Sequence, residues 1–98
     1  MKSVKVSYTV KPSFVAQNQQ NINAFMEELK QLGRLDIRYS IYLGEDGKTF
    51  THLSLYQNVE AQNTFLELES FKFFQKERDE SGLEMEPNIE VLNLLAAY

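Results

Sequence analysis

Hydrophobic and polar side chains alternate from residue 3 to residue 11. A period of two is typical of a β-strand that buries one face and leaves the other in water. Pro12 follows the pattern and predicts the end of the strand, because proline has no N–H to donate to a sheet. The apolar side of this strand carries Val4, Val6, Tyr8 and Val10.

The next segment, "AQNQQNINAFMEELKQLG" at residues 16–33, changes from a period of two to helical spacing. Its apolar residues form one stripe on an otherwise polar surface, which is typical of a helix that packs one face on a core. We expect Gly33 to end the helix in the left-handed conformation. The stripe consists of Ile22, Phe25, Met26, Leu29 and Leu32.

Two further strands are predicted at residues 35–43 and 49–56, with the sequence "GEDG" at 44–47 between them. The Asp46–Gly47 pair favours a hairpin turn, because both residue types tolerate positive φ. We therefore expect the two strands to be antiparallel neighbours. The apolar side of the first of them carries Leu35, Ile37, Tyr39, Ile41 and Leu43.

Two short helices and a last strand complete the chain. Asn58 and Ser70 are the expected N-caps of the helices, because their side-chain oxygens can accept from free N–H groups in the first turn. Gly82 and Pro87 bracket a loop, and "NIEVLNLLAAY" at residues 88–98 is predicted as the last strand. The helices carry Ala61, Phe65 and Leu66 in the first and Phe71, Phe74 and Arg78 in the second.

The predicted order of elements is β-α-β-β-α-β within a single domain, residues 1–98. Such a chain folds most economically as a four-stranded antiparallel sheet with its helices on one face, the ferredoxin-like arrangement of the α+β class.

The two faces of this sheet follow from alternation within each strand. The face against the helices is predicted to hold Val4, Val6, Tyr8, Ile37, Tyr39, Ile41, Leu53 and Leu55. The opposite face is predicted to hold Lys5, Ser7, Thr9, Arg38, Ser40, Tyr42, Phe50, His52, Ser54 and Tyr56. The last strand is apolar on both sides and adds leucines to this second face.

This second face predicts a partner. Leaving Tyr42, Phe50, Tyr56 and two leucines in water would forgo roughly 1.5–3 kcal/mol for each side chain. A homodimer in which the two sheets cover each other would bury at least roughly 1,200 Å² and remove this loss. The alternative is a monomer with an exposed, partly apolar sheet face.

Charge and composition exclude several classes of function. The net charge is −4, and the basic cluster Lys72, Lys76 and Arg78 is interleaved with acidic residues. The chain therefore has no basic face for nucleic acid. No segment approaches the roughly 18 apolar residues that cross a bilayer, so we expect no membrane span. The absence of cysteine favours a reducing cytoplasm.

Metal and cofactor sites are not predicted. His52 is the only histidine, and there is no cysteine, so a multi-histidine or thiolate metal site cannot form. The four glycines do not form a phosphate-binding loop or a dinucleotide fingerprint. We expect no bound cofactor.

His52 is the leading candidate for chemistry. A neutral imidazole accepts a phenolic or enolic proton near physiological pH, and removal of that proton gives a carbanion that can reduce O₂. Tyr42 and Tyr56 are the expected catalytic partners that orient a substrate hydroxyl. The alternative is a half-buried strand histidine that is satisfied by Ser40, Ser54 or a backbone carbonyl. The expected substrate-binding residues are Arg38, Ser40, Phe50 and Ser54.

The chain resembles the antibiotic-biosynthesis-monooxygenase-like family of the dimeric α/β-barrel superfamily. The resemblance covers the whole order of elements and is strongest at residues 37–74, which contain an "n-x-e-a" helix start and an "s-x-x-f" tail. The matching residues are Asn58, Glu60 and Ala61 in the start and Ser70, Phe71 and Phe74 in the tail.

The resemblance implies a homodimer whose two sheets form a barrel, with a cavity between sheet and helices or within the barrel. Two departures narrow the implied activity. Quinone-forming members use a tryptophan and an asparagine in the cavity, and this chain has no tryptophan. Haem-degrading members place a histidine before the "s-x-x-f" tail, where this chain has Glu67 and Glu69.

Three classes of function stay open from the sequence. The first is a cofactor-independent monooxygenase acting on a small enolisable or aromatic substrate. The second is a barrel that binds a small molecule, or serves in stress, without turnover. The third is a purely structural interaction module. Open space around His52, large enough for a ring, would favour the first class, whereas partner side chains that fill this space would favour the second.

Overall fold

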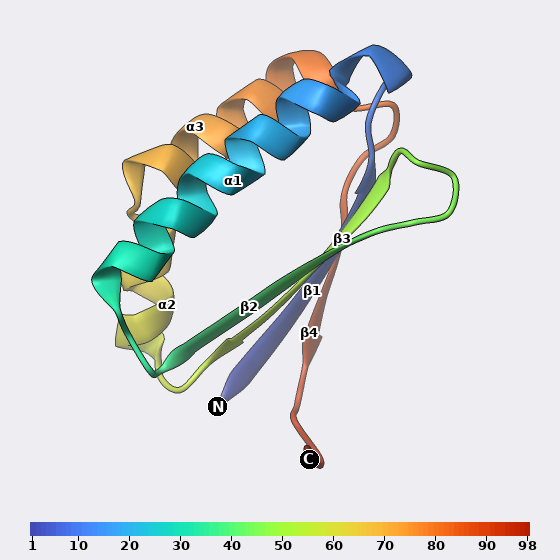
Figure 1. Ribbon diagram of the computed structural model, residues 1–98. Coiled ribbons are helices and arrows are strands. Elements are labelled where there is room, and N and C mark those ends of the chain that lie inside the picture. Colours follow the sequence, from blue (N-terminus) through green and yellow to red (C-terminus); the bar gives the residue numbers. More distant parts are fainter.

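The computed structural model describes residues 1–98 and has a four-stranded antiparallel sheet with the helices on one face (Figure 1). The strands lie in the order β2-β3-β1-β4, which confirms the ferredoxin-like prediction. No helix is both long and apolar enough to span a membrane. The elements are β1 (Lys2–Thr9), α1 (Val15–Leu32), β2 (Ile37–Leu43), β3 (Thr49–Tyr56), α2 (Val59–Leu66), α3 (Glu69–Glu77) and β4 (Asn88–Leu92).

Two turns of other helix types join these elements. The 3₁₀ turn η1 (Pro12–Phe14) leads into α1, and the π-helical turn η2 (Arg78–Gly82) continues α3. β1 ends three residues before Pro12, and Val10 makes only an isolated bridge to Leu83. Arg78, which we predicted inside a regular helix, therefore begins the π turn instead.

The ends of three helices test the predicted caps. Gly33 ends α1 with φ of 61°, in the left-handed region, as predicted. The side chain of Asn58 accepts a hydrogen bond of 2.8 Å from the N–H of Ala61 and caps α2, also as predicted. The prediction for Ser70 was wrong. Leu68 is the N-cap of α3, and the N–H and hydroxyl of Ser70 both donate to the Glu28 carboxylate on α1.

Two further strands are, like β1, shorter than predicted. β2 begins at Ile37, and Leu35 is 95 % exposed outside it. Arg34 binds both carboxylate oxygens of Asp36, at 2.9 and 2.7 Å, which holds the preceding loop as a compact turn. β4 ends at Leu92 rather than continuing to residue 98.

The orientation of β3 corrects the predicted faces of the sheet. Val6 on β1 and Ile41 on β2 are both paired with His52 on β3, and paired residues share a face. His52 therefore faces the helices. Leu53 and Leu55, which we predicted on the helix side, lie on the outer face instead, and the prediction for β3 was wrong by one residue of phase.

The helix-facing side of β3 contributes directly to the core. Phe50, His52, Ser54 and Tyr56 are all less than 8 % exposed. The apolar core lies between the sheet and the helices that Figure 1 shows over its one face. Its buried residues are Tyr8, Val10, Ile22, Phe25, Ile37, Phe50, Tyr56, Ala61, Phe65, Leu68, Phe71 and Phe74.

Candidate functional site

A chain of hydrogen-bonded side chains crosses this core. His52 is 2 % exposed, and each of its ring nitrogens meets a tyrosine hydroxyl. The Nε2 atom lies 2.7 Å from the Tyr8 hydroxyl on β1, and Nδ1 lies 2.8 Å from the Tyr39 hydroxyl on β2. The amide nitrogen of Asn18 on α1 donates to the Tyr8 hydroxyl at 3.0 Å. Three strands and a helix thus supply the four members.

The donors and acceptors assign a direction to the chain. Because Asn18 donates to the Tyr8 oxygen, the Tyr8 hydrogen is available for His52 Nε2. A neutral imidazole has one donor and one acceptor nitrogen, so Nδ1 then carries the proton and donates to the Tyr39 oxygen. The Tyr39 hydroxyl keeps its own hydrogen, which no member of the chain uses.

Burial keeps all three ring groups neutral. Burial, with a smaller contribution from the positive charge of Arg78, lowers the pKa of His52 to about 3. Burial also raises the pKa values of Tyr8 and Tyr39 well above the ordinary value for tyrosine. At physiological pH the chain therefore consists of a neutral imidazole and two protonated phenols.

Arg78 brings a positive charge to one end of the chain. Its guanidinium carbon lies 5.1 Å from the ring centroid of Tyr8 and 5.3 Å from that of Phe74, within the range of a cation–π contact. Its Nε donates to Asp79 at 2.9 Å. The π turn that Arg78 begins places this side chain against the core, and single π turns often occur at functional sites.

Aromatic rings enclose His52. The ring centroids of Tyr8, Phe25, Tyr39 and Phe74 lie between 5.2 and 6.1 Å from that of His52. The space around the imidazole is thus filled by side chains of the same chain, and a ligand ring does not fit against it in this conformation. A direct contact between His52 and a substrate therefore has no support.

Tyr39 connects the buried chain to the surface. A cavity of about 340 Å³ lies between α1 and the edge strand β2, and a second cavity of about 330 Å³ lies between α1 and strands β2 and β3. Tyr39 contributes to the wall of the first, together with Met26, Leu29 and Ile37. Phe50 and Ile41 contribute to the second. We call the first of these cavities, which Tyr39 lines, the α1–β2 groove.

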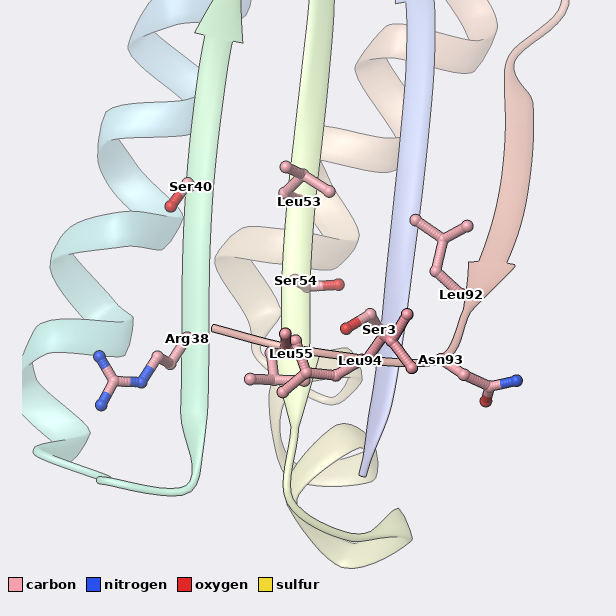
Figure 2. A pocket seen from close by; sticks show the side chains of 11 residues that line it. Ser3, Arg38, Ser40, Leu53, Ser54, Leu55, Leu92, Asn93 and Leu94 are labelled. Atoms are coloured by element: carbon pink, nitrogen blue, oxygen red, sulfur yellow. The ribbon is translucent and has the colours of Figure 1, made fainter. Parts of the chain in front are cut away.

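A third cavity, of about 370 Å³, lies on the outer face of the sheet (Figure 2). Leu53 and Leu55 of β3 form its floor, and Arg38 stands on one side. Figure 2 shows the chain after Leu92 crossing the neighbouring strands, so that Leu94 lies over this floor. The cavity is therefore formed between the sheet and the C-terminal segment.

The predicted site residues divide between the two faces. His52, Phe50, Ser54 and Tyr56 lie on the helix side, and the Ser54 hydroxyl donates to a backbone oxygen of Val4 at 3.3 Å. The other three predicted site residues, Arg38, Ser40 and Tyr42, lie on the outer face of β2. Tyr42 is 57 % exposed there.

The actual partners of His52 were not predicted from the sequence. Tyr8 and Tyr39 were correctly predicted on the helix side, but only as core residues. No role was predicted for Asn18, and Arg78 was predicted only to lie on a helix. The signal for Tyr8 and Tyr39 was the pairing of β3 with its neighbours, which puts both hydroxyls beside the imidazole once the phase of β3 is right. No sequence signal identifies Asn18.

Solved structures share this fold at low sequence identity. A crystal structure of an antibiotic biosynthesis monooxygenase is similar at a TM-score of 0.83, with 12 % identity over 98 % of this chain and 100 % of that chain. The structure of Rv0793 from Mycobacterium tuberculosis is similar at a TM-score of 0.81, with 15 % identity over 98 % of this chain and 96 % of that chain. The structure of PA3566 from Pseudomonas aeruginosa is similar at a TM-score of 0.79, with 15 % identity over 97 % of this chain and 94 % of that chain. No protein-family model and no curated protein sequence matches the chain.

These comparisons define the class of the protein by fold. The chain has the ferredoxin-like fold that is found in antibiotic biosynthesis monooxygenases, and the match covers almost its whole length. The resemblance noted in the sequence is confirmed at that level.

Proposed function

We propose that the protein is a cofactor-independent monooxygenase that acts on a small, enolisable aromatic compound. Two observations carry the proposal: a buried, neutral hydrogen-bond chain ends at the Tyr39 hydroxyl, and the Tyr39 side chain also lines the α1–β2 groove. The shared fold with a structure described as an antibiotic biosynthesis monooxygenase supports the reaction class.

In this proposal Tyr39, rather than His52, contacts the substrate. The substrate ring lies in the α1–β2 groove, and its carbonyl oxygen accepts the Tyr39 hydrogen. This hydrogen bond becomes stronger as the substrate ionises to its enolate, so it favours the charged form. The pKa of His52, about 3, is too low for it to hold the substrate proton. The proton leaves to water through the open groove, and His52 positions Tyr39.

The reaction balances with O₂ as the oxidant. The enolate carbanion transfers one electron to O₂, and the resulting radical and superoxide combine to form a carbon-bound peroxide. Loss of water from the protonated peroxide breaks the O–O bond and leaves a ketone. A CH₂ group thus becomes C=O, with one oxygen atom in the product and the other in water.

The outer face of the sheet supports a homodimer as part of the proposal. Phe50 and Tyr56, which we predicted on this face, lie in the core instead and do not contribute to it. Leu53 and Leu92, each 37 % exposed, and Tyr42 take their place, and Leu94 of the C-terminal segment is 45 % exposed beside them. A second copy laid over these side chains would remove them from water.

Anthrone, an aromatic ketone that enolises at a CH₂ group, tests the activity. Under nitrogen, fluorescence titration should show saturable binding. Admission of ¹⁸O₂ should then give one ¹⁸O atom in the quinone product and consumption of O₂ faster than in buffer. Binding with no acceleration of O₂ uptake, or no binding by anthrone and related ketones, would reject the enzyme.

A second candidate is a small-molecule-binding protein without turnover. The enclosure of His52 by aromatic rings favours it, because no base in the core can reach a ligand. The same titration separates the two candidates, since this second protein would bind anthrone and leave its oxidation rate equal to that in buffer.

A further inference from the structure

In the side-chain amide of Asn18, the nitrogen makes a hydrogen bond and the oxygen makes none. The residue is fully buried on α1, and its nitrogen donates to the Tyr8 hydroxyl at 3.0 Å. Its side-chain oxygen is the one buried side-chain polar atom that has no hydrogen-bond partner. Buried polar atoms in folded proteins are nearly always bonded, and the bond from the nitrogen to Tyr8 is the one hydrogen bond that this buried side chain makes.

The orientation of this amide decides how every hydrogen in the chain is placed. With its nitrogen toward Tyr8, the Tyr8 hydrogen points to His52 Nε2, and Nδ1 donates to Tyr39. An acceptor in place of that nitrogen would take the Tyr8 hydrogen. His52 would then have to donate from Nε2, and the Tyr39 hydrogen would point inward to Nδ1. The hydrogen available in the groove would be lost.

We propose that Asn18 is a positioning residue that holds neutral His52 in the Nδ1–H tautomer and so keeps the Tyr39 hydroxyl free to donate into the α1–β2 groove. The effect of this device on a substrate rests on the proposed function. The tautomer itself does not, because it belongs to the protein without ligand.

The single histidine makes the tautomer directly measurable. A protein labelled with ¹⁵N-histidine gives the two ring nitrogens of His52 alone, and their chemical shifts distinguish a protonated nitrogen from an unprotonated one. For the wild-type protein we expect a protonated Nδ1 and an unprotonated Nε2, unchanged from pH 6 to pH 8. A protonated Nε2 in the wild-type spectrum would overturn the proposal without any variant.

Asn18→Asp tests the cause. A carboxylate of almost the same shape has only acceptors, so at pH 8 it should take the Tyr8 hydrogen and move the His52 proton to Nε2. Asn63→Asp makes the same chemical change on the exposed face of α2 and should leave the spectrum as in the wild type. Retention of the Nδ1–H tautomer in Asn18→Asp would contradict a controlling role for Asn18.

Asn18→Leu keeps the test decisive if the carboxylate prevents folding. Without a donor or an acceptor at this position, the two tautomers should both be populated, and a spectrum identical to the wild type would overturn the proposal. In binding, Asn18→Asp should weaken the anthrone complex roughly tenfold, as expected for loss of one hydrogen bond. If the wild type and Asn18→Asp show the expected His52 tautomers but the wild type does not bind anthrone, the proposed function is rejected and the role of Asn18 stands.

Discussion

His52 is held in the core as a neutral group. Its two ring nitrogens are satisfied by tyrosine hydroxyls, so the desolvation of the polar ring is compensated in the neutral form. Burial removes the charged form from water, and the nearby guanidinium of Arg78 disfavours it further, which explains why the pKa of His52 falls to about 3. The folded state therefore excludes the histidinium ion that the unfolded chain forms near pH 6.5.

This difference predicts a loss of stability in mild acid. Above pH 6.5 the group is neutral in both states, whereas below it only the unfolded chain binds the proton, so stability falls as the pH decreases toward 3. We expect the free energy of unfolding to decrease by roughly 2 kcal/mol between pH 7 and pH 5. Urea denaturation at both pH values measures it. His52→Gln should remove most of the difference, and an equal decrease in that variant would contradict the assignment.

The hairpin of β2 and β3 shows what the sequence could have predicted. The N–H of Gly44 donates to the carbonyl of Thr49 at 2.7 Å, which centres the turn on the Asp46–Gly47 pair. Residues equally far from that centre are paired, so Ile41 must lie beside His52. The position of the predicted turn was therefore enough to fix which residues of β2 and β3 are paired. Because alternation was applied to each strand separately, the phase of β3 was assigned wrongly and His52 was placed outside.

The packing of α1 on α3 could not be read from the sequence in the same way. Glu28 accepts from the backbone N–H of Ser70 at 3.3 Å and from its hydroxyl. A carboxylate at this place satisfies the free N–H group of Ser70 in the first turn and interacts favourably with the helix dipole. It comes from a helix about forty residues earlier, and local patterns such as Ser70 as an N-cap carry no information about such a distant partner.

Glu28→Ala should therefore destabilise the fold through the start of α3. Loss of a charged cap is expected to lower the free energy of unfolding by about 1 kcal/mol. The neighbouring Glu27 is exposed and makes no ion pair, so Glu27→Ala is the matched control and should have little effect. Equal denaturation midpoints for the two variants would show that Glu28 does not cap α3.

The outer face of the sheet mixes leucines with polar side chains. Arg38, Leu55, Ser3 and Leu92 form one row across all four strands, and Ser40, Leu53, Lys5 and Glu90 form the next row toward the hairpin. Nearer the hairpin, the hydroxyls of Thr9 and Thr49 bond to each other at 2.9 Å. The C-terminal segment crosses this face and places Leu94 over the leucines of β3. The prediction of an apolar outer face thus depended on residues partly different from those present.

We predict that the protein in solution has twice the chain mass of 11.4 kDa. Leu53→Glu replaces an exposed leucine in the middle of the outer face with a charge and should give the mass of a single chain in sedimentation at micromolar concentration. Val59, on α2, is 68 % exposed on the helix side, so Val59→Glu should leave the dimer intact. A single-chain mass for the wild-type protein would contradict the dimer.

The order of elements is the part of the fold that local patterns determine well. Alternation, the Asp46–Gly47 turn and the caps at Gly33 and Asn58 predicted the topology and most of the element boundaries. The site depends instead on side chains from distant segments. Asn18, Tyr8 and Tyr39 meet His52 only when the sheet and α1 are in place, and none of them has a motif of its own.

The comparison of Tyr39→Phe with Tyr42→Phe tests the central claim most directly. The two residues lie on the same strand, three positions apart, and their side chains are on opposite faces of the sheet. If the substrate oxygen binds the Tyr39 hydroxyl, Tyr39→Phe should lower kcat for anthrone oxidation roughly a hundredfold, as for loss of one oxyanion donor. Tyr42→Phe should leave kcat unchanged. Equal rates for Tyr39→Phe and the wild type, or a large loss in Tyr42→Phe alone, would contradict a site on the helix side.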